Sequence, residues 1–321
     1  MKKFTVLFTG IVIATIISLM LVDNENSSLC DGITEIPLTE CRALLTLYTD
    51  TDGLHWKNRS GWYQTPTPCQ WHGLSCYQGH ITKISLLENQ LAGALPDLSA
   101  LTHLQVLSLL GNQLNGRFPD LFTFSQLKEL DFSNNQLTGI IPDLSALTQL
   151  QHLRLSNNQF TGVIPNLSRL TQLRWIFLYD NQLIGSVPNL SELTQLRGLN
   201  LSNNRLTGTI PLLTGLTQLK MLNLANNQLS GHFPDLSTLN KLQWLDLSNN
   251  HLNGSLPNFP PLKNLQMIDL SNNQFSGELP DLSVLSPQLS SFNFAHNSFC
   301  RNPEKNYAPW EKELENFPSC R

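Results

Sequence analysis

The chain has 321 residues, of which only 14% are charged, and a formal net charge of −4. Soluble domains average about 25% charged residues, so uncharged polar side chains must keep much of this surface in water. Because the chain has no basic excess that could neutralise phosphates, nucleic acid is excluded as a partner.

Residues 1–28 are predicted to direct export. Lys2 and Lys3 precede an apolar run over residues 4–22, and a polar stretch begins at Asp23. This arrangement is typical of a secretory signal peptide. The run is also long enough for membrane anchoring through residues 4–22, because about 20 apolar residues span a bilayer. We favour cleavage, keep the anchor as an alternative, and expect a secreted or cell-surface protein.

Residues 81–299 repeat one frame, LxxLxLxxNxFxGxIP, as in residues 150–165. A fixed period of this length with this frame is the signature of leucine-rich repeats. It predicts an α/β solenoid, a right-handed superhelix of about ten repeats with a parallel β-sheet on its concave face. The repeated Asn residues are 23 residues apart, with a final step of 24: Asn89, Asn112, Asn135, Asn158, Asn181, Asn204, Asn227, Asn250, Asn273 and Asn297.

The physics of the frame assigns a role to each position. Leu153 lies in a short strand and points inward, so its sequence neighbours face outward. The Asn that follows is expected to be buried, where its amide satisfies backbone groups of its own and adjacent coils. Asn89, at the edge of the array, is expected to matter less than Asn181 in the middle. Gly162 permits a bend, and the Ser/Thr-rich return segment is expected to be a 3₁₀ or irregular arc on the convex side.

Differences between the repeats indicate where a ligand binds. The outward positions of the fifth coil are Trp175, Phe177 and Tyr179, where most coils have Ser, Asn or Asp. Arg154 and His152 occupy equivalent positions one coil earlier. Large aromatic residues and Arg often anchor interfaces, so the cluster is a candidate recognition surface. The alternative is that these aromatics only tile a twisted sheet for stability.

A second indole extends this candidate surface. Trp244 lies three coils after Trp175, about 14 Å along the sheet at the usual strand spacing. Gly198 and Met221 are expected to form a lower floor between the two indoles, so that the groove holds a peptide strand or stacks against sugar rings. The candidate ligand-binding residues are Trp175, Phe177, Tyr179, Arg154, His152, Met221, Trp244 and Asp246.

An enzymatic role has little support. The Ser residues of the SNN segments recur from coil to coil, as at Ser133 and Ser156, and therefore belong to the repeat. Asp246 and Asp269 are expected about 5 Å apart on adjacent strands, a separation similar to that of a retaining glycosidase pair. No third group and no catalytic motif accompany them. We expect no enzymatic activity, no cofactor and no metal site.

The segment Cys69 to Cys76 reads CQWHGLSC and resembles the CxWxGVxC segment that closes the amino-terminal cap of plant-type leucine-rich repeat proteins. That family includes receptor-kinase ectodomains and polygalacturonase-inhibiting proteins. Residues 40–45 and 51–53, with Trp56 and Trp62, look like the cap of secreted bacterial and algal relatives. The resemblance covers roughly residues 30–300 and implies the fold. It does not imply one ligand, because the family binds peptides, proteins, steroids and glycans on one scaffold.

Six cysteines lie in the expected caps, residues 29–80 and 300–321, and none lies in the repeats before residue 300. In an exported chain this placement predicts disulfides that cover the exposed edges of the end coils. The family resemblance implies that Cys69 pairs with Cys76. Cys300 with Cys320 would close the carboxyl-terminal cap around Trp310, which leaves Cys30 with Cys41. The cysteine spacing does not supply the four clustered ligands of a zinc finger.

These observations together predict an exported, disulfide-capped leucine-rich repeat protein that binds a protein, peptide or glycan on its concave face. Two other functions stay open. The resemblance suggests an inhibitor of a secreted polysaccharide-degrading enzyme. A structural or adhesive role at the cell surface is favoured if residues 4–22 are not cleaved.

Overall fold

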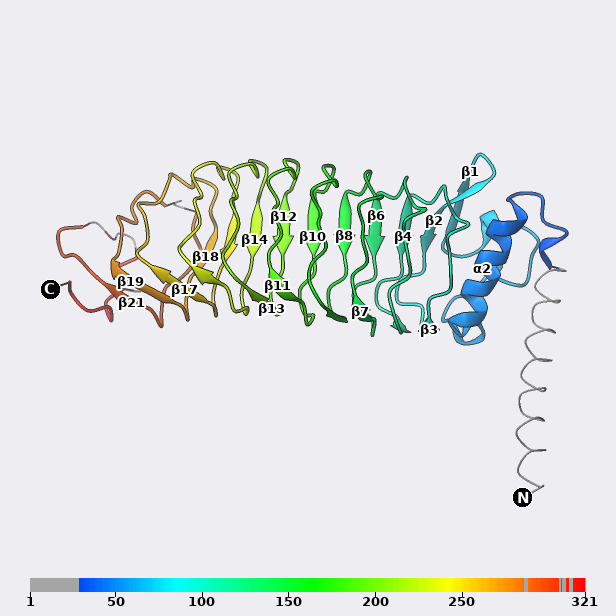
Figure 1. Ribbon diagram of the computed structural model, residues 1–321, viewed down its shortest axis with the longest axis horizontal. Helices are drawn as coiled ribbons and strands as arrows, with labels where there is room; N and C mark the ends of the chain where they lie inside the picture. The colour runs from blue at the N-terminus through cyan, green and yellow to red at the C-terminus, as the bar shows by residue number, and fades with distance from the viewer. Residues whose placement is uncertain (1–28, 286–287, 306, 308–309, 312–313, 321) are drawn as a thin grey trace, which may run out of the picture.

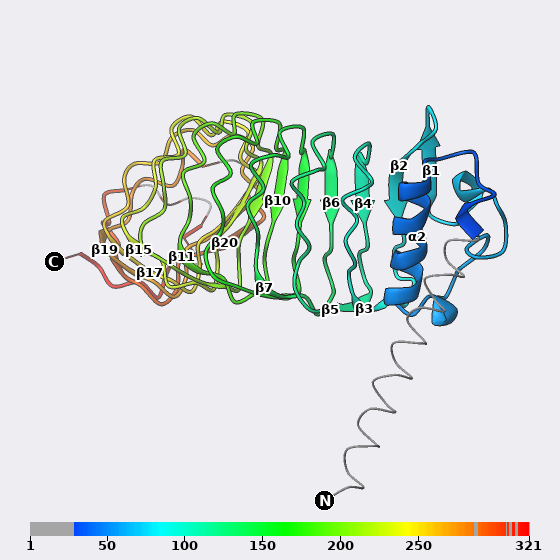
Figure 2. The ribbon, with the colours of Figure 1, turned by 45° about the vertical axis from the view of Figure 1, so that its right-hand side comes forward.

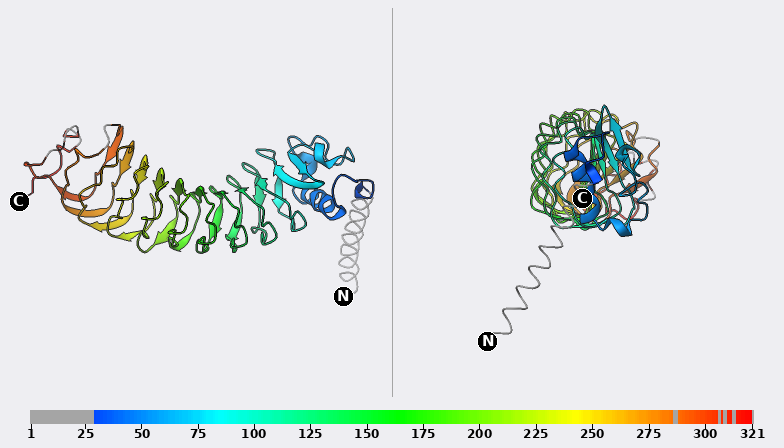
Figure 3. Two further views of the ribbon diagram at one scale, coloured as in Figure 1. Left: turned by 90° about the horizontal axis from the view of Figure 1, so that it is seen from above. Right: turned by 90° about the vertical axis from the view of Figure 1, so that its right-hand side faces the viewer.

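The computed structural model is an elongated solenoid of stacked coils (Figure 1). The structure describes residues 29–285, 288–305, 307, 310–311 and 314–320, so the predicted export segment lies outside the described residues. Seen from above, the coils form an arc, and the strands of the largest sheet lie on its inner side (Figure 3). The predicted leucine-rich repeat solenoid is confirmed. Within the described part of the chain, no helix has the length and apolarity needed to cross a membrane.

The inner face is one 11-stranded sheet in which each coil contributes a strand. β1 and β2 are antiparallel, and each later strand is parallel to its neighbours, with equivalent residues paired. The middle residue of each strand from β4 to β18 is buried because it points into the coil, as Leu153 and Ile176 do. The strands are β1 Leu74–Tyr77, β2 His80–Ser85, β4 Val106–Ser108, β6 Glu129–Asp131, β8 His152–Arg154, β10 Trp175–Phe177, β12 Gly198–Asn200, β14 Met221–Asn223, β16 Trp244–Asp246, β18 Met267–Asp269 and β20 Ser291–Asn293.

A second set of strands, which the sequence pattern did not predict, follows the repeated Asn of each coil. They form a four-stranded sheet, β15-β17-β19-β21, and the two-stranded sheets β3-β5, β7-β9 and β11-β13. Their bounds are β3 Ala92–Ala94, β5 Gln113–Asn115, β7 Thr138–Ile140, β9 Gln159–Thr161, β11 Ile184–Ser186, β13 Arg205–Thr207, β15 Ser230–Gly231, β17 His251–Gly254, β19 Gln274–Glu278 and β21 Ser298–Cys300.

The repeated Gly of the frame makes room for this second set of strands. Gly162 has a φ of +75°, and a Cβ added there would lie 2.8 Å from a methyl group of Ile140 in the preceding coil. Gly185 has the same relation to Val163, at 2.9 Å. Each Gly therefore supplies both a left-handed backbone and a seat for the outward side chain of the coil before it.

The buried Asn ladder is present as the frame predicts. Asn181 accepts a hydrogen bond from the Phe160 backbone N–H at 3.0 Å and donates to the Leu155 carbonyl at 3.0 Å. Asn89 does not behave as an exposed edge position: it is 2% exposed, and it accepts from the Asn58 N–H at 2.6 Å and donates to the Asn58 carbonyl at 2.9 Å. Asn89 was expected to matter less because it lies at the edge of the array. That premise is wrong, because the cap covers this edge and contacts Asn89 as a neighbouring coil would.

The amino-terminal cap covers the first coil with the helix α2 (Leu38–Asp50), seen beside β2 in Figure 2. Two 3₁₀ turns follow, η1 (Gly53–His55) and η2 (Pro68–Gln70). The ring of Tyr48 lies 5.1 Å from that of Trp56 and 6.1 Å from that of Trp62, measured between centroids. This aromatic cluster buries the apolar edge that an end coil would otherwise expose to water.

Disulfides close both ends of the array, as capping requires. In the carboxyl-terminal cap, the Trp310 ring stacks on Phe292 of the last inner strand with centroids 5.4 Å apart. Lys305 pairs with Glu278 at 2.8 Å. The structure has three disulfides: Cys30 with Cys41, Cys69 with Cys76, and Cys300 with Cys320.

Candidate functional site

Strand pairing on the inner face brings most of the candidate residues side by side. Trp175 pairs with His152 on one side and with Gly198 on the other. Phe177 pairs with Arg154 in the same ladder. The site is therefore a contiguous part of the sheet formed by β8, β10 and β12.

The three aromatics of the fifth coil form a packed row on this sheet. The Trp175 and Phe177 rings meet edge to face with centroids 5.7 Å apart, and the Phe177 and Tyr179 rings follow at 6.4 Å. All three side chains are half-buried. Aromatic pairs in this geometry gain about 0.5–1.5 kcal/mol beyond the burial of area, so the row is stabilised by its own contacts and still presents apolar surface to solvent.

Gly198 is not part of an open floor, which corrects the expectation from sequence. The Trp175 indole lies over it: a Cβ at Gly198 would come within 2.4 Å of the ring carbons. Gly198 is consequently buried. Because Gly198 has no side chain, the Trp175 indole can lie directly over it, and this contact sets the tilt of the ring.

Arg154 is held on the side away from the aromatics. Its Nη1 atom lies 2.7 Å from Glu129 Oε1 and 3.9 Å from Asp131 Oδ2. Burial lowers the pKa of His152, and the nearby charge of Arg154 lowers it further, so the imidazole is neutral near pH 7. Glu129 belongs to the site but was not singled out from sequence, although it occupies the same outward column as His152.

Asp246, which was predicted to bind ligand, also has a structural role in the turn that follows its strand. Its Oδ1 accepts hydrogen bonds from the Ser248 N–H at 3.1 Å and from the Ser248 hydroxyl at 2.7 Å. Asp269 holds Ser271 in the same way. Burial raises the pKa of Asp246, and the neighbouring Asp269 adds to the increase. Both carboxylates therefore close turns at the strand ends.

The same turn-closing contact recurs at the equivalent position of other coils. We call this column of equivalent residues the Asx column. The backbone N–H two residues later is held by Asp131, Asn200, Asn223, Asp246, Asp269 and Asn293. From the third coil onward, only Arg154 and Phe177 interrupt it. Among the described residues, the buried Ser156 hydroxyl in the fourth coil has no hydrogen-bond partner. The fourth and fifth coils have therefore lost a stabilising contact where the aromatic row lies.

Trp244 and Met221 continue the apolar surface along the sheet. They pair with each other in adjacent strands, and Trp244 is 43% exposed. Three strand steps separate Trp244 from Trp175, about 14 Å. The inner face thus presents one indole that is seated on a glycine, a methionine, and a second indole that projects into solvent.

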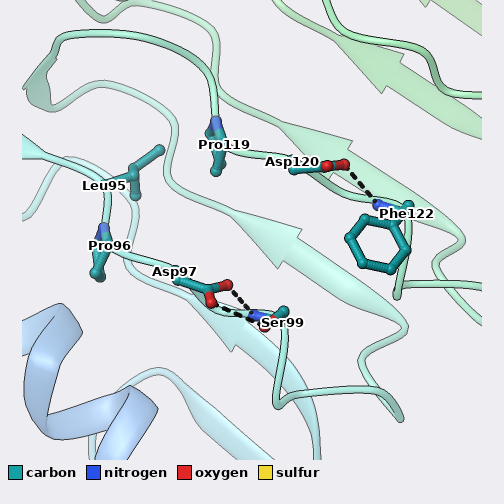
Figure 4. Close-up of a pocket in the computed structure, with 7 residues that line it drawn as sticks. All are labelled: Leu95, Pro96, Asp97, Ser99, Pro119, Asp120 and Phe122. Carbon is teal, nitrogen blue, oxygen red and sulfur yellow. Dashed lines mark hydrogen bonds between the residues drawn. The ribbon is translucent and has the colours of Figure 1, made fainter.

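Two surface hollows lie away from the inner face. One, of about 400 Å³, is lined by Leu95, Pro96 and Phe122 among others (Figure 4). Its acidic side chains are occupied: Asp97 accepts from the Ser99 N–H and Asp120 from the Phe122 N–H. The other, of about 550 Å³, lies between the last coil and Phe317. We assign neither hollow to the site.

Plant proteins of known structure share this architecture. The ectodomain of the Arabidopsis thaliana receptor kinase GASSHO1/SCHENGEN3, in complex with CASPARIAN STRIP INTEGRITY FACTOR 2, has 36% identity and a TM-score of 0.63, covering 68% of this chain. The Arabidopsis receptor kinase HAESA, in complex with the peptide hormone IDA and the co-receptor SERK1, has 28% identity and a TM-score of 0.53, covering 80%. A plant ice-binding protein has 28% identity and a TM-score of 0.68, covering 83% of this chain and 89% of its own.

This chain is a plant-type leucine-rich repeat protein. Its sequence matches the family described as "Leucine Rich repeats (2 copies)" over residues 125–167 and 194–241. It matches "Leucine Rich Repeat" over residues 241–261 and 264–283. The leucine-rich repeat protein spans 27% of the GASSHO1/SCHENGEN3 chain and 54% of the HAESA chain. None of the curated proteins matches it.

Proposed function

We propose that this leucine-rich repeat protein is a non-enzymatic extracellular binding protein that recognises an extended peptide segment of a partner protein on its inner face. The observation that carries the proposal is the interruption of the Asx column at Arg154 and Phe177. A turn-closing hydrogen bond contributes about 0.5–1.5 kcal/mol. Recognition of a ligand explains why these coils lack that hydrogen bond and present aromatic side chains in its place.

The shape and chemistry of the surface favour a peptide. Trp175 and Trp244 bracket about 14 Å of sheet, the length of roughly four extended residues. Met221 between them is a flexible, polarisable contact that adapts to different side chains. Arg154 and Glu129 add a charged edge. HAESA, a structural neighbour, was solved with a peptide hormone, and disulfides at both ends support an extracellular location.

The decisive variant truncates the two outer residues of the row and leaves Phe177 in place. Trp175→Ala with Tyr179→Ala should weaken binding by about 2 kcal/mol or more, about thirtyfold, as hot-spot truncations do. The assay is capture of partners from the native extracellular fraction, followed by titration of the captured protein and of peptides derived from it. Phe122→Ala is the matched control, because Phe122 is an aromatic 63% exposed elsewhere on the surface.

Melting of the same preparations separates recognition from packing. If the row only stabilises the sheet, the double variant should melt at a clearly lower temperature, and its binding loss should follow the unfolded fraction. Gly198→Ala is a subtler test, since it keeps every aromatic but displaces the Trp175 indole from its seat. Unchanged affinity in both variants would overturn the proposal.

A second candidate function, ice binding, is favoured by a different surface. Strand pairing in the second set of strands places Ile140 beside Thr161, and an isolated bridge places Val163 beside Ile184. Ile140 is 66% exposed and Val163 is 59% exposed. A band of methyl and hydroxyl groups at regular strand spacing is a surface that could order water. The likeness to a plant ice-binding protein over most of both chains supports this candidate.

Ice recrystallisation assays distinguish the two functions. Val163→Asp places a charge in the band and should abolish inhibition of recrystallisation while leaving the inner face intact. Trp175→Ala should leave that inhibition unchanged. No inhibition by the unmodified protein removes this candidate and does not affect the peptide proposal.

A further inference from the structure

Three metal-ligating side chains meet where the amino-terminal cap joins the first coils. Glu40 comes from α2, His80 from the start of β2, and His103 from the turn before β4. Each offers one ligand atom, and these atoms all lie within 4.8 Å of one another. We call this group the cap cluster. Its members are far apart in sequence, so their approach is a product of the fold.

Glu40 is the buried member of the cap cluster, and hydrogen bonds hold both of its carboxylate oxygens. Its side chain is 2% exposed. Its Oε2 atom accepts a hydrogen bond from the Ile81 N–H at 2.8 Å, while Oε1 lies 2.7 Å from His80 Nδ1. A buried carboxylate is costly unless it is paired with a positive charge or a metal. The cap cluster thus presents a buried, preorganised carboxyl group directed at an imidazole.

We propose that the cap cluster binds a divalent transition-metal ion, with zinc the preferred ion. Two imidazole nitrogens and one carboxylate oxygen are a donor set that suits zinc, and such a set leaves a fourth position for water. Magnesium and calcium prefer oxygen ligands alone and are not expected to bind. The ion takes the place of the hydrogen bond between His80 and Glu40: His80 coordinates through the ring nitrogen that carries no proton, and its other nitrogen keeps the proton.

Binding requires small movements of His103 and of His80, whose Nδ1 lies only 2.7 Å from Glu40 Oε1. The His80 and His103 rings stack with centroids 3.7 Å apart and an interplanar angle of 18°, so their lone pairs lie in two nearly parallel planes and do not converge on one point. Tetrahedral zinc, about 2.0–2.1 Å from each ligand atom, needs ligand atoms about 3.4 Å apart. His103 is half-exposed and lies in a turn, so its ring can tilt out of the stack to converge on the ion with His80.

The position of the cap cluster gives the ion a mechanical role. Glu40 belongs to the cap helix, whereas His80 and His103 belong to the first two coils. An ion bound to all three ties the cap to the array at a point separate from the disulfides. Because such an ion binds the folded state and not the unfolded chain, it stabilises this end of the solenoid.

Calorimetric titration of tag-free, chelator-treated protein with zinc chloride tests the proposal, with magnesium chloride as the control ion. We expect a single zinc site and a higher melting temperature in zinc. His103→Gln should weaken zinc binding at least about tenfold and abolish the zinc-dependent rise in melting temperature. His55→Gln is the matched control, because His55 is an exposed histidine 2.7 Å from the carboxylate of Asp52 and should bind zinc as the unmodified protein does.

Melting in chelator shows whether His103→Gln folds normally, so a folding defect cannot be mistaken for a lost ligand. Absence of zinc binding to the unmodified protein, or unchanged affinity in His103→Gln, would overturn the proposal. The Trp175→Ala and Tyr179→Ala double variant should bind zinc normally. The test of the metal site is therefore independent of the test of the peptide-binding function.

Discussion

Replacing Asn181 with Ala probes the ladder that holds the coils together. The change removes an acceptor for the Phe160 N–H at 3.0 Å. It also removes three donated hydrogen bonds, to the carbonyls of Leu155, Leu178 and Tyr179 at 3.0, 3.1 and 3.3 Å. Asn181 is 9% exposed, so water replaces few of these contacts.

The loss is smaller than four contacts suggest, because the carbonyls are shared. Each of the three carbonyls keeps a second donor: Asn158 Nδ2 at Leu155, Asn204 Nδ2 at Leu178 and the Asn157 N–H at Tyr179. Only the buried Phe160 N–H is left without a partner. Leaving one such donor unpaired costs about 1–3 kcal/mol, and with the weakened carbonyls we expect a total of about 2–4 kcal/mol.

Urea unfolding measures this loss, and hydrogen exchange locates it. The Phe160 amide should exchange much faster in Asn181→Ala than in the unmodified protein, while amides several coils away change little. Gln159→Ala, at an exposed neighbouring position, is the control and should cost less than about 0.5 kcal/mol. A loss in Asn181→Ala no larger than this control, with a protected Phe160 amide, would refute the ladder account.

Three further results are expected. Asn89→Ala should cost as much as Asn181→Ala and loosen the cap, because Asn89 holds the Asn58 backbone; a much smaller loss by the same unfolding assay would contradict this. Replacing Cys69 and Cys76 with Ser should destabilise the amino-terminal end by about 2–4 kcal/mol, and nonreducing mass spectrometry checks the pairing. In nuclear magnetic resonance titrations, Arg154→Gln should raise the pKa of His152 by removing a nearby positive charge, and Glu129→Gln should lower it further. Shifts of the same sign would contradict this electrostatic account.

The lowered pKa of His152 also predicts a pH dependence of stability. The unfolded chain takes up a proton near the ordinary histidine pKa of about 6.5, whereas folded His152 takes it up only at lower pH. Its contribution to stability is therefore complete above this pH and is lost as the pH falls through the folded-state pKa. Between pH 8 and pH 5, the unfolding free energy of the unmodified protein should fall relative to that of His152→Gln, which has no titrating group at this position.

The sequence by itself determined the architecture and the neighbours of most inner-face residues. A period of 23 residues fixes which side chains share a column, because each coil stacks on the next in the same register. The pairing of Trp175 with His152 and Gly198 follows from that arithmetic. The same period identified the buried ladder, whereas the caps were recognised from the resemblance of the Cys69 to Cys76 segment and from the placement of the cysteines at the two ends.

Only the tertiary structure decided where the side chains point and what they hold. Periodicity places Asp246 on the inner face but does not show that its carboxylate turns back to Ser248. It places Arg154 beside Phe177 but not against Glu129, and it leaves Gly198 as an empty position until the Trp175 indole covers it. The cap cluster was also hidden, because Glu40 lies outside the repeat. Side-chain rotamers and cap packing depend on contacts between non-equivalent residues, and a repeat pattern contains no information about those.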